Sequence, residues 1–391
     1  FGLGFKSLLR LGGKIDITSG EGAFGFDPEK CRRELKQEFQ VEEAPGLRLA
    51  WPLPDGRTAY LRNRFPWATT VVCAEIGQQD VREHLVWELQ DFPAEFLLFL
   101  PVSVRLTLQT CGGAKRALRR EMDSEDVVLV DEEASTSSRW RVADKIVHVE
   151  DMNAKNDATH IHNRERVPLA WALPLDGKRE ESGRFWAFFP THTPTFLPGI
   201  LNAPWKLNSD RNSLIRGEWN TFLMKEAARL VAEALPQLAT EDDPGRVLDA
   251  FPRQPDRTDV DAAPLLEELW GRLQEEKVIP DGLGRLRKAG ELRRHPRDNS
   301  ELICEWQKLA KEAGLGQAVH FSCVQGQRGS RLKHLAELLA KGGGDAPQFP
   351  NLRQMPLKEW FDEVASTEED RVHSALRLAE AYCNDCKPHE W

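Results

Sequence analysis

The spacing of hydrophobic residues changes along this chain of 391 residues, and that change constrains the fold more than any other feature. Between residues 101 and 190, short runs rich in β-branched residues alternate with polar or glycine-containing turns, which is the pattern of β-strands. After residue 258, leucine and tryptophan recur instead at intervals of three and four residues, the period of an amphipathic helix. The sequence therefore predicts an α+β protein with strand-rich and helix-rich regions.

The same changes of pattern set the expected domain boundaries. Domains commonly hold ~100–200 residues, so a chain of this length predicts two or three of them. We expect a first α/β region over residues 1–92, an α/β middle segment over 93–239 and a mostly α-helical C-terminal domain over 259–391. Residues 240–258 concentrate acids, prolines and glycine, and they are expected to form a linker.

Local periodicity places individual elements within these regions. Each expected strand is an alternating or β-branched run, and each expected helix carries its apolar residues on one face. The expected helices cover residues 28–39, 79–89 and 218–238, and the expected strands cover residues 14–18, 69–76, 102–108, 127–130, 146–149, 167–173 and 184–189.

Charge and cysteine content limit the partners and the compartment. Lys and Arg number 53 against 62 Asp and Glu, so the net charge of −9 gives the whole chain no attraction to nucleic acid or to an anionic membrane. The seven cysteines are odd in number and scattered, which indicates reduced thiols. The longest apolar run, Phe96 to Val104, is well short of the ~20 residues that span a bilayer, and no signal-peptide pattern is present. We therefore expect a cytoplasmic protein.

Two glycines, Gly2 and Gly4, stand one residue apart at the start of the chain, before an apolar segment. Glycine reaches positive φ without steric cost, so backbone N–H groups in such a turn can point at an anion, and the N-terminus of a following helix adds favourable charge. This arrangement suggests a loop that holds nucleotide phosphates. The alternative is a plain tight turn, because the spacing matches neither common phosphate-loop motif.

Several segments in the right order resemble one family. The run Gly2-Leu3-Gly4-Phe5-Lys6-Ser7-Leu8-Leu9, followed by Lys14 to Gly20 and Phe24 to Pro28, resembles the ATP lid and the next strands of the sacsin-like, heat-shock-chaperone-type ATPases. These belong to the GHKL group, which has the Bergerat fold. Further matches, in family order, are Pro93 to Leu100, Phe189 to Thr191 with Leu197 to Gly199, Leu207 to Leu214, and Trp219-Asn220. The resemblance covers roughly residues 1–238.

The resemblance implies a fold and an activity. Residues 1–92 would be the rear part of a Bergerat-type α/β sandwich, and the chain would be a fragment that begins inside the lid motif. The intact protein would bind ATP and Mg²⁺ and act as an ATP-driven clamp on a protein or nucleic-acid client. The Asn that ligates Mg²⁺, the Glu that orients water and an Asp-x-Gly-x-Gly loop would precede Phe1, so the fragment alone is not expected to hydrolyse ATP.

A different reading is a non-catalytic scaffold or interaction module, in which the ATPase-like domain is degenerate. Two sets of partners therefore remain open. An ATP-driven clamp would bind ATP and a client, whereas a scaffold would bind other proteins without nucleotide. A homodimer is a further arrangement that the sequence leaves open. Nucleic acid is a further partner expectation, based on the basic stretch from Arg285 to Arg297, although such runs of charge are usually solvated surface.

The resemblance also assigns nucleotide contacts in the first region. Lid backbone amides would come from Gly2, Leu3, Gly4 and Phe5, and the charge of Lys6 would face phosphate unless it is simply solvated. Thr69 matches a strand threonine near the adenine, although Thr70 is an alternative in register and both residues also favour strand structure.

Arg211 is the expected catalytic residue. It lies in the polar run Asn208-Ser209-Asp210-Arg211-Asn212 just before an expected helix. In the chaperone relatives an arginine on such a middle-segment loop contacts the γ-phosphate, where a guanidinium stabilises developing charge. The competing interpretation is an Asp-Arg pair that caps the helix that follows.

Metal-binding patterns are weak. Cys383 and Cys386 form a single CxxC with His389 nearby, and His160 and His162 share strand-like spacing without a carboxylate partner. Chance spacing explains both better than a zinc site does, so no metal ligand is assigned within this chain.

Overall fold

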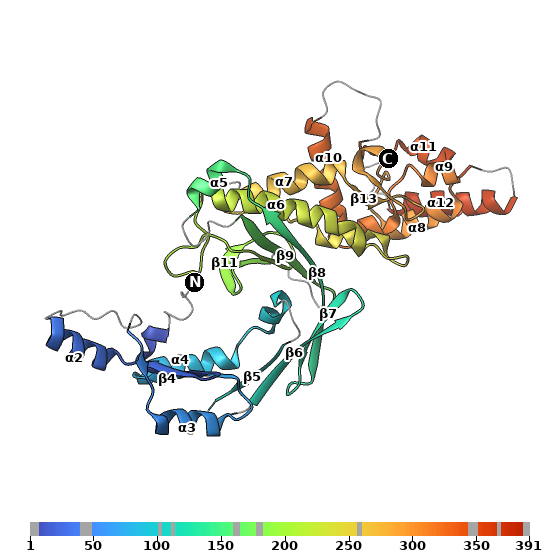
Figure 1. Ribbon diagram of the computed structural model, residues 1–391. Coiled ribbons are helices and arrows are strands. Elements are labelled where there is room, and N and C mark those ends of the chain that lie inside the picture. Colours follow the sequence, from blue (N-terminus) through green and yellow to red (C-terminus); the bar gives the residue numbers. More distant parts are fainter. Residues whose placement is uncertain are drawn as a thin grey trace. The chain divides into compact units, whose positions relative to one another are not determined.

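A computed structural model describes residues 8–39, 49–100, 104–110, 113, 115–158, 165–176, 183–255, 260–342, 351–365 and 369–385 (Figure 1). The chain divides into two compact units, residues 1–93 with 106–117 and residues 94–105 with 118–391. Helices and strands are both abundant, so the predicted α+β class is confirmed. Among the helices of the described ranges, none combines the length and hydrophobicity that crossing a bilayer requires.

The first unit is built on a four-stranded sheet with the order β3-β2-β1-β4, in which all neighbours are antiparallel. Its strands are β1 (Gly12–Ser19), β2 (Gly22–Phe26), β3 (Trp51–Pro52) and β4 (Thr70–Ile76). Gly20 has a φ of 52° in the turn between β1 and β2, a conformation that glycine adopts without the usual steric cost. The hairpin places Ile15 opposite Phe26.

The two faces of this sheet differ in chemistry. On one face, Ile15 and Ile17 are buried in a small apolar core with Phe26. On the other face, Asp16 forms an ion pair of 2.7 Å with Arg57 of helix α3. The helical elements of the unit are η1 (Leu8–Leu11), α2 (Pro28–Phe39), α3 (Asp55–Arg64) and α4 (Gln79–Gln90). Helix α2 has the bounds that periodicity predicts.

The second sheet has the order β11-β10-β12-β9-β8-β7-β6-β5. Its strands are β5 (Arg105–Gln109), β6 (Lys115–Asp123), β7 (Asp126–Asp131), β8 (Thr136–His148), β9 (Arg166–Pro174), β10 (Arg184–Trp186), β11 (Pro190–Pro194) and β12 (Ile200–Asn202). Strands β6 to β9 are joined in sequence as an antiparallel meander, and β10 pairs with β12 in parallel.

Strand β10 is shorter than predicted, because the chain turns after Trp186. Phe188 has a φ of 65°, and its N–H donates to Oδ1 of Asn202 over 2.8 Å. A left-handed phenylalanine cannot continue a β-ladder. The expected strand over residues 184–189 therefore ends at this turn, and β11 begins at Pro190.

The core of the second unit lies between β8, β9 and a long helix. Alternate residues of β9, among them Leu169, Trp171 and Leu173, are buried, as expected for a strand with one face against the core. Helix α6 (Glu218–Ala234), continued by η3 (Leu235–Leu238), buries Leu223 and Val231 in the same cluster. The predicted helix over 218–238 is thus confirmed, with a 3₁₀ turn at its end.

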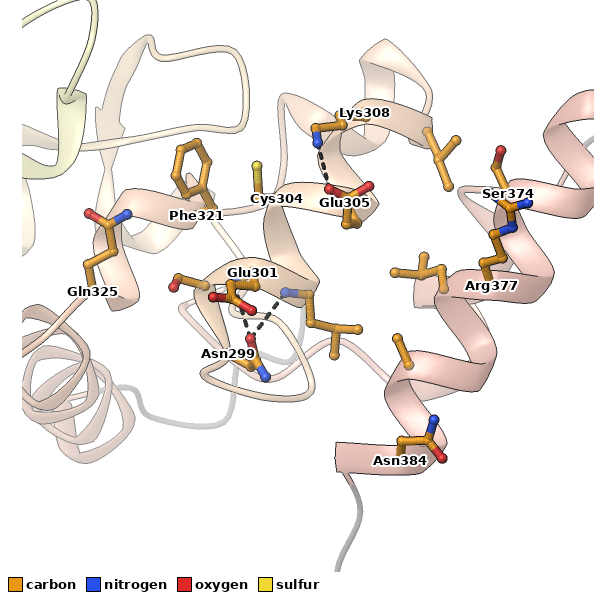
Figure 2. A pocket seen from close by; sticks show the side chains of 15 residues that line it. Asn299, Glu301, Cys304, Glu305, Lys308, Phe321, Gln325, Ser374, Arg377 and Asn384 are labelled. Carbon is orange, nitrogen blue, oxygen red and sulfur yellow. Dashed lines mark hydrogen bonds and ion pairs between the residues drawn. The ribbon is translucent and has the colours of Figure 1, made fainter.

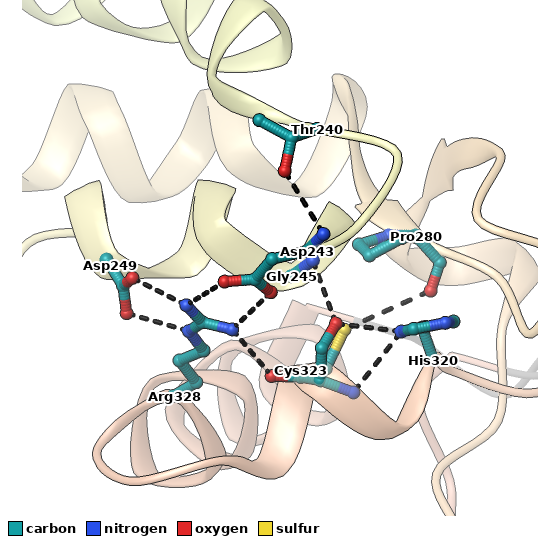
Figure 3. A network of polar contacts seen from close by, with 9 residues as sticks. Thr240, Asp243, Gly245, Asp249, Pro280, His320, Cys323 and Arg328 are labelled. Atoms are coloured by element: carbon teal, nitrogen blue, oxygen red, sulfur yellow. Dashed lines mark hydrogen bonds and ion pairs between the residues drawn. The ribbon is translucent and has the colours of Figure 1, made fainter. Parts of the chain in front are cut away.

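Residues 244–251, within the segment expected as a linker, pack into this core instead. Residues 244–250 form the 3₁₀ helix η4 (Pro244–Ala250), and Val247 and Phe251 are fully buried in the cluster that contains α6. Asp243 and Asp249 both bind the guanidinium of Arg328 (Figure 3). Here the structure differs from the sequence expectation, because two acids of this stretch, Asp243 and Asp249, are paired with an arginine far along the chain.

The remaining residues are mostly helical, as predicted. The elements are α7 (Ala263–Glu275), β13 (Lys277–Pro280), β14 (Leu286–Lys288), η5 (Ala289–Glu291), α8 (Ser300–Leu309), α9 (Glu312–Leu315), η6 (Phe321–Val324), α10 (Arg328–Gly342), α11 (Leu357–Asp362) and α12 (Glu369–Asp385). A separate small core forms around Trp306, Trp360 and Leu378.

Candidate functional site

The loop that carries Arg211 lies in the second unit, between β12 and α6. It is closed at its base by an antiparallel bridge between Leu207 and Leu214 and by a hydrogen bond of 3.0 Å from Ile215 N–H to Lys206 C=O. A closed base limits the loop to eight residues, 207–214. The sequence therefore forms a short hairpin here, whose tip is Ser209-Asp210-Arg211.

Asn208 organises the inside of this loop. Its Oδ1 accepts hydrogen bonds from the N–H groups of Asn212 (3.1 Å) and Ser213 (3.3 Å), and its Nδ2 donates to Oδ1 of Asn212. Its carbonyl accepts from Arg211 N–H at 3.0 Å. Asparagine is suited to this role because its short amide reaches backbone groups a few residues away.

Arg211 itself has a left-handed backbone, with a φ of 59°. This conformation is disfavoured for any residue with a Cβ and persists only where surrounding contacts hold it. Those contacts include strand β11, because His192 N–H donates to Asn212 C=O at 2.6 Å and Leu214 N–H donates to Oγ1 of Thr193 at 3.2 Å. The backbone at Arg211 is therefore fixed from inside the loop and from the sheet.

The guanidinium of Arg211 is exposed. Within the residues that the structure describes, it has neither a hydrogen bond nor an ion pair, whereas its neighbour Arg216 pairs with Asp261 at 2.8 Å. The adjacent carboxylate of Asp210 accepts from the hydroxyl of Ser209 at 3.3 Å. Arg211 thus combines a fixed backbone with an exposed guanidinium, whose five N–H groups can donate hydrogen bonds to an anionic ligand.

The capping interpretation of Asp210 and Arg211 is wrong, because another residue caps the helix. Oδ2 of Asp157, at the end of helix α5 (Met152–Asp157), accepts the N–H of Trp219 in the first turn of α6 at 3.0 Å. Asp157 also binds Lys206 Nζ at 2.5 Å. The Lys206 bond, with the backbone N–H bonds after it, lowers the pKa of Asp157 below its ordinary 3.8, so this carboxylate is charged at neutral pH.

The first-region candidates are only partly described. Gly2, Leu3, Gly4, Phe5 and Lys6 lie outside the described residues, so their predicted phosphate contacts stay predictions. The other first-region candidate, Thr69, is exposed, and its carbonyl accepts from Gly20 N–H at 3.3 Å at the β1–β2 turn.

Thr70, the alternative in register, begins strand β4. Its Oγ1 lies 2.8 Å from Oγ of Ser19 on β1. The two hydroxyls share a hydrogen bond across neighbouring strands, which agrees with the strand-forming reading of both threonines.

The basic stretch is largely engaged within the protein. Arg285 and Arg287 both bind the fully buried carboxylate of Asp281, at 3.2 and 3.1 Å. Lys288 pairs with Glu275 and Arg293 with Glu359. These partners reduce the positive charge that a nucleic-acid backbone would meet, so the stretch reads as internally balanced surface.

Metal ligands do not gather in the part of the chain that the structure describes: no group of three or more His, Cys, Asp or Glu side chains is placed to hold an ion. Among the weak candidates, His160, His162, Cys386 and His389 lie outside the described residues. Cys383 is an exposed free thiol near the end of α12.

A wide pocket of about 1090 Å³ lies between α8 and α12 (Figure 2). Its charged lining has both signs: Glu301 and Glu305 come from α8, with Lys308 bound to Glu305 at 2.5 Å, and Arg377 comes from α12. Asn299 is occupied as the cap of α8, where its Oδ1 accepts two N–H groups. A lining of mixed sign indicates no particular ligand class.

Comparisons with known proteins add no identity. Models of protein families, curated proteins and solved structures all give no match to this chain. The loop geometry and the residues themselves are therefore the basis for assigning a function.

Three supports of the Arg211 loop differ in how visible they are in the sequence. Asn208 lies within the recognised polar run, so its local role is readable from spacing. Thr193 and Asp157 lie 18 and 54 positions before Arg211. Their local sequence does not predict a contact with this loop.

Proposed function

We propose that this chain is part of an ATP-binding, chaperone-like clamp, in which Arg211 contacts the terminal phosphate of ATP. The observation that carries the proposal is the Arg211 loop: an exposed guanidinium without a partner among the described residues, on a backbone held in a disfavoured conformation. Strain that the surroundings maintain is common where a side chain has to be preorganised for binding.

The resemblance supplies the identity of the ligand. A guanidinium recognises phosphate through paired, charge-assisted hydrogen bonds, and in phosphoryl transfer such a group stabilises charge on the γ-phosphate. The order of the lid segment, the β1–β2 hairpin, the middle segment and the Arg211 loop follows the sacsin-like ATPases. The finer fold that goes with this proposal is the rear part of a Bergerat-type sandwich for the first unit.

Magnesium enters the proposal only through the resemblance. Mg²⁺ prefers oxygen ligands and commonly keeps several waters while bridging nucleotide phosphates. Since no cluster of ligating side chains is found among the described residues, we assign none of them to the metal. The role of this chain in the proposal is limited to phosphate contacts from Arg211 and from the predicted lid amides.

The first test measures nucleotide affinity. In the full-length protein, Arg211→Ala is expected to weaken ATP binding about tenfold to a hundredfold, because a hydrogen bond to a charged group contributes roughly 1.5–3 kcal/mol. ADP affinity is expected to stay nearly unchanged, since ADP lacks the phosphate that Arg211 contacts. Isothermal titration calorimetry with ATP and with ADP measures both values.

The matched control is Arg216→Ala, which removes another exposed arginine five positions away that is already paired with Asp261. It is expected to leave both affinities as in the unmodified protein. Equal ATP affinities for the unmodified protein and for Arg211→Ala would reject the phosphate contact.

The second candidate function is a non-catalytic scaffold. It is favoured by the apolar face of the first sheet, where Phe24 and Val72, both opposite Ile17 in register, are 38% and 49% exposed. Apolar side chains that cluster on a surface often mark an interaction site. Absence of nucleotide binding in the full-length protein would favour this function over the ATP-driven clamp.

A further inference from the structure

Asn220 is buried in the first turn of α6 and makes contacts at the base of the Arg211 loop. Its side chain is 2% exposed. Oδ1 accepts the N–H of Lys206 at 2.8 Å, while Nδ2 donates to the carbonyl of Lys206 at 2.7 Å and to the carbonyl of Ile215 at 2.8 Å. The side-chain amide of Asn220 thus binds three backbone groups, with its oxygen as acceptor and its nitrogen as donor.

Those backbone groups flank the loop on both sides. Lys206 precedes residue 207 and Ile215 follows residue 214, so Asn220 joins the two ends of the loop to helix α6. The direct bond between the two ends, Ile215 N–H to Lys206 C=O, shares the same carbonyl with Asn220. The amide therefore fixes both the width of the loop base and its position on the helix.

The chemistry of the site requires an amide. A carboxylate has no donor, so it would face the carbonyls of Lys206 and Ile215 without hydrogen bonds and with repulsion. An apolar side chain would leave buried backbone groups without their partner, which is costly in a closed site. Asparagine matches one donor N–H and two acceptor carbonyls at once.

The loop needs such support because its tip is strained. Arg211 has a φ of 59°, a conformation that persists only where surrounding contacts hold it. Without those contacts the loop would sample many conformations, and only some of them would place the guanidinium for phosphate binding. When only a fraction of molecules has the binding-competent conformation, apparent affinity falls by that fraction. A loss of order at the loop base should therefore appear as weaker recognition by Arg211.

We propose that Asn220 is the positioning residue of the Arg211 loop: it holds the guanidinium where the terminal phosphate of a nucleoside triphosphate is recognised. The inference rests on the proposed function and deepens it, since it names a residue that acts through Arg211 without touching the ligand. The opposing possibility is that Asn220 only stabilises the fold.

The experiment compares Asn220→Asp and Asn220→Ala with Arg211→Ala in the full-length protein. Asn220→Asp keeps the size of the side chain and removes its donors. We expect amide hydrogen exchange of residues 208–215 to accelerate at least tenfold, and ATP affinity to fall about threefold to tenfold with ADP affinity unchanged. Combined with Arg211→Ala, Asn220→Asp is expected to cause no further loss of ATP affinity.

The matched control is Gln307→Glu. Gln307 is also an amide that bridges backbone groups, since Nε2 donates to Val319 C=O at 3.2 Å and Oε1 accepts Phe321 N–H at 3.3 Å. Gln307→Glu makes the same amide-to-acid change away from the Arg211 loop. We expect this substitution to leave the ratio of ATP to ADP affinity unchanged. A general loss of stability would affect this control and Asn220→Asp alike.

Two outcomes separate the inference from the proposed function. If Arg211→Ala lowers ATP affinity but Asn220→Asp and Asn220→Ala do not, Asn220 is not a positioning residue and the phosphate contact stands. If Arg211→Ala itself has no effect, the proposed function fails and the inference fails with it. Should both Asn220 variants not fold, Thr193→Val loosens the loop from the sheet side, by removing the acceptor of Leu214 N–H, and the same loss of ATP affinity is expected.

Discussion

Arg328→Met is expected to lower the free energy of unfolding of the second unit by about 3 kcal/mol. Arg328 is only 8% exposed, and its guanidinium makes four hydrogen bonds of 2.7 Å to the carboxylates of Asp243 and Asp249 and one of 3.1 Å to Ser322 C=O. Removing it leaves two neighbouring carboxylates without their counter-charge. Urea denaturation followed by tryptophan fluorescence measures the change.

We expect a value at the lower end of the usual cost for breaking a buried pair, ~3–5 kcal/mol. The side chains of Asp243 and Asp249 are 35% and 31% exposed, so water replaces part of what Arg328 supplied. Arg293→Met is the control, because Arg293 pairs with the more exposed Glu359 and should cost less than about 1 kcal/mol. A loss for Arg328→Met no larger than for this control contradicts the prediction.

A second comparison identifies the cause. In the triple variant Arg328→Met, Asp243→Asn, Asp249→Asn, the repulsion between the two carboxylates is absent. We expect it to regain part of the stability that Arg328→Met alone loses, because removing a whole ionic group costs less than leaving part of it unpaired. No recovery would mean that packing of the arginine stem, and not charge, determines the loss.

The same contacts explain why sequence patterns misidentify residues 240–258. Asp243 and Asp249 are 85 and 79 positions from the arginine that binds them. A short stretch rich in acids, prolines and glycine predicts a solvated segment, because this local pattern does not take account of a distant arginine that can pair with the acids. The sequence does contain buried apolar residues there, Val247 in η4 and Phe251 just after it, but so short a 3₁₀ helix gives no clear periodic signal.

Elements with a long, regular period were predictable. Helix α2 and helix α6 with its 3₁₀ extension match their expected ranges, because amphipathic spacing over several turns is a local property. Strand β10 was predicted too long, because the left-handed conformation of Phe188 depends on a hydrogen bond with Asn202, which comes from another strand. Local sequence carries no signal of that bond.

The candidate site divides in the same way. Arg211 and Asn208 are three positions apart in one polar run, so a polar loop that contains Arg211 and precedes a helix could be predicted. The contacts that fix this loop come from Thr193, Asn220 and Asp157, and only the structure brings them together.

His295 gives the second large effect, which depends on pH. The ring is 1% exposed; Nε2 lies 2.9 Å from Val319 C=O, and Nδ1 accepts from Nε1 of Trp360 at 2.9 Å. The neutral ring with its hydrogen on Nε2 satisfies both contacts, whereas a protonated ring would set two donors against each other at Nδ1. Burial lowers the pKa of His295 from 6.5 to about 4.

Stability should therefore fall in mild acid. As the pH falls from 6.5 to about 4, the unfolded chain binds a proton on this ring and the folded chain does not. The contribution is complete above pH 6.5 and is lost progressively below it, to a total of about 3 kcal/mol. Burial lowers the pKa of His320 as well, which adds a change of the same sign, while Asp27 and Asp157, whose pKa values lie below 3.8, act at lower pH.

Comparison with His295→Gln isolates the contribution of this ring. Glutamine can donate to one partner and accept from the other but does not titrate, so the variant keeps much of the hydrogen bonding and loses the pH dependence. We expect urea denaturation between pH 7.5 and 4.5 to show a decline in unfolding free energy that is steeper in the unmodified protein by up to about 3 kcal/mol over the range. Parallel declines would mean that His295 is already protonated in the folded state or exposed to water, and would contradict the buried, neutral ring around which Trp306 and Trp360 pack.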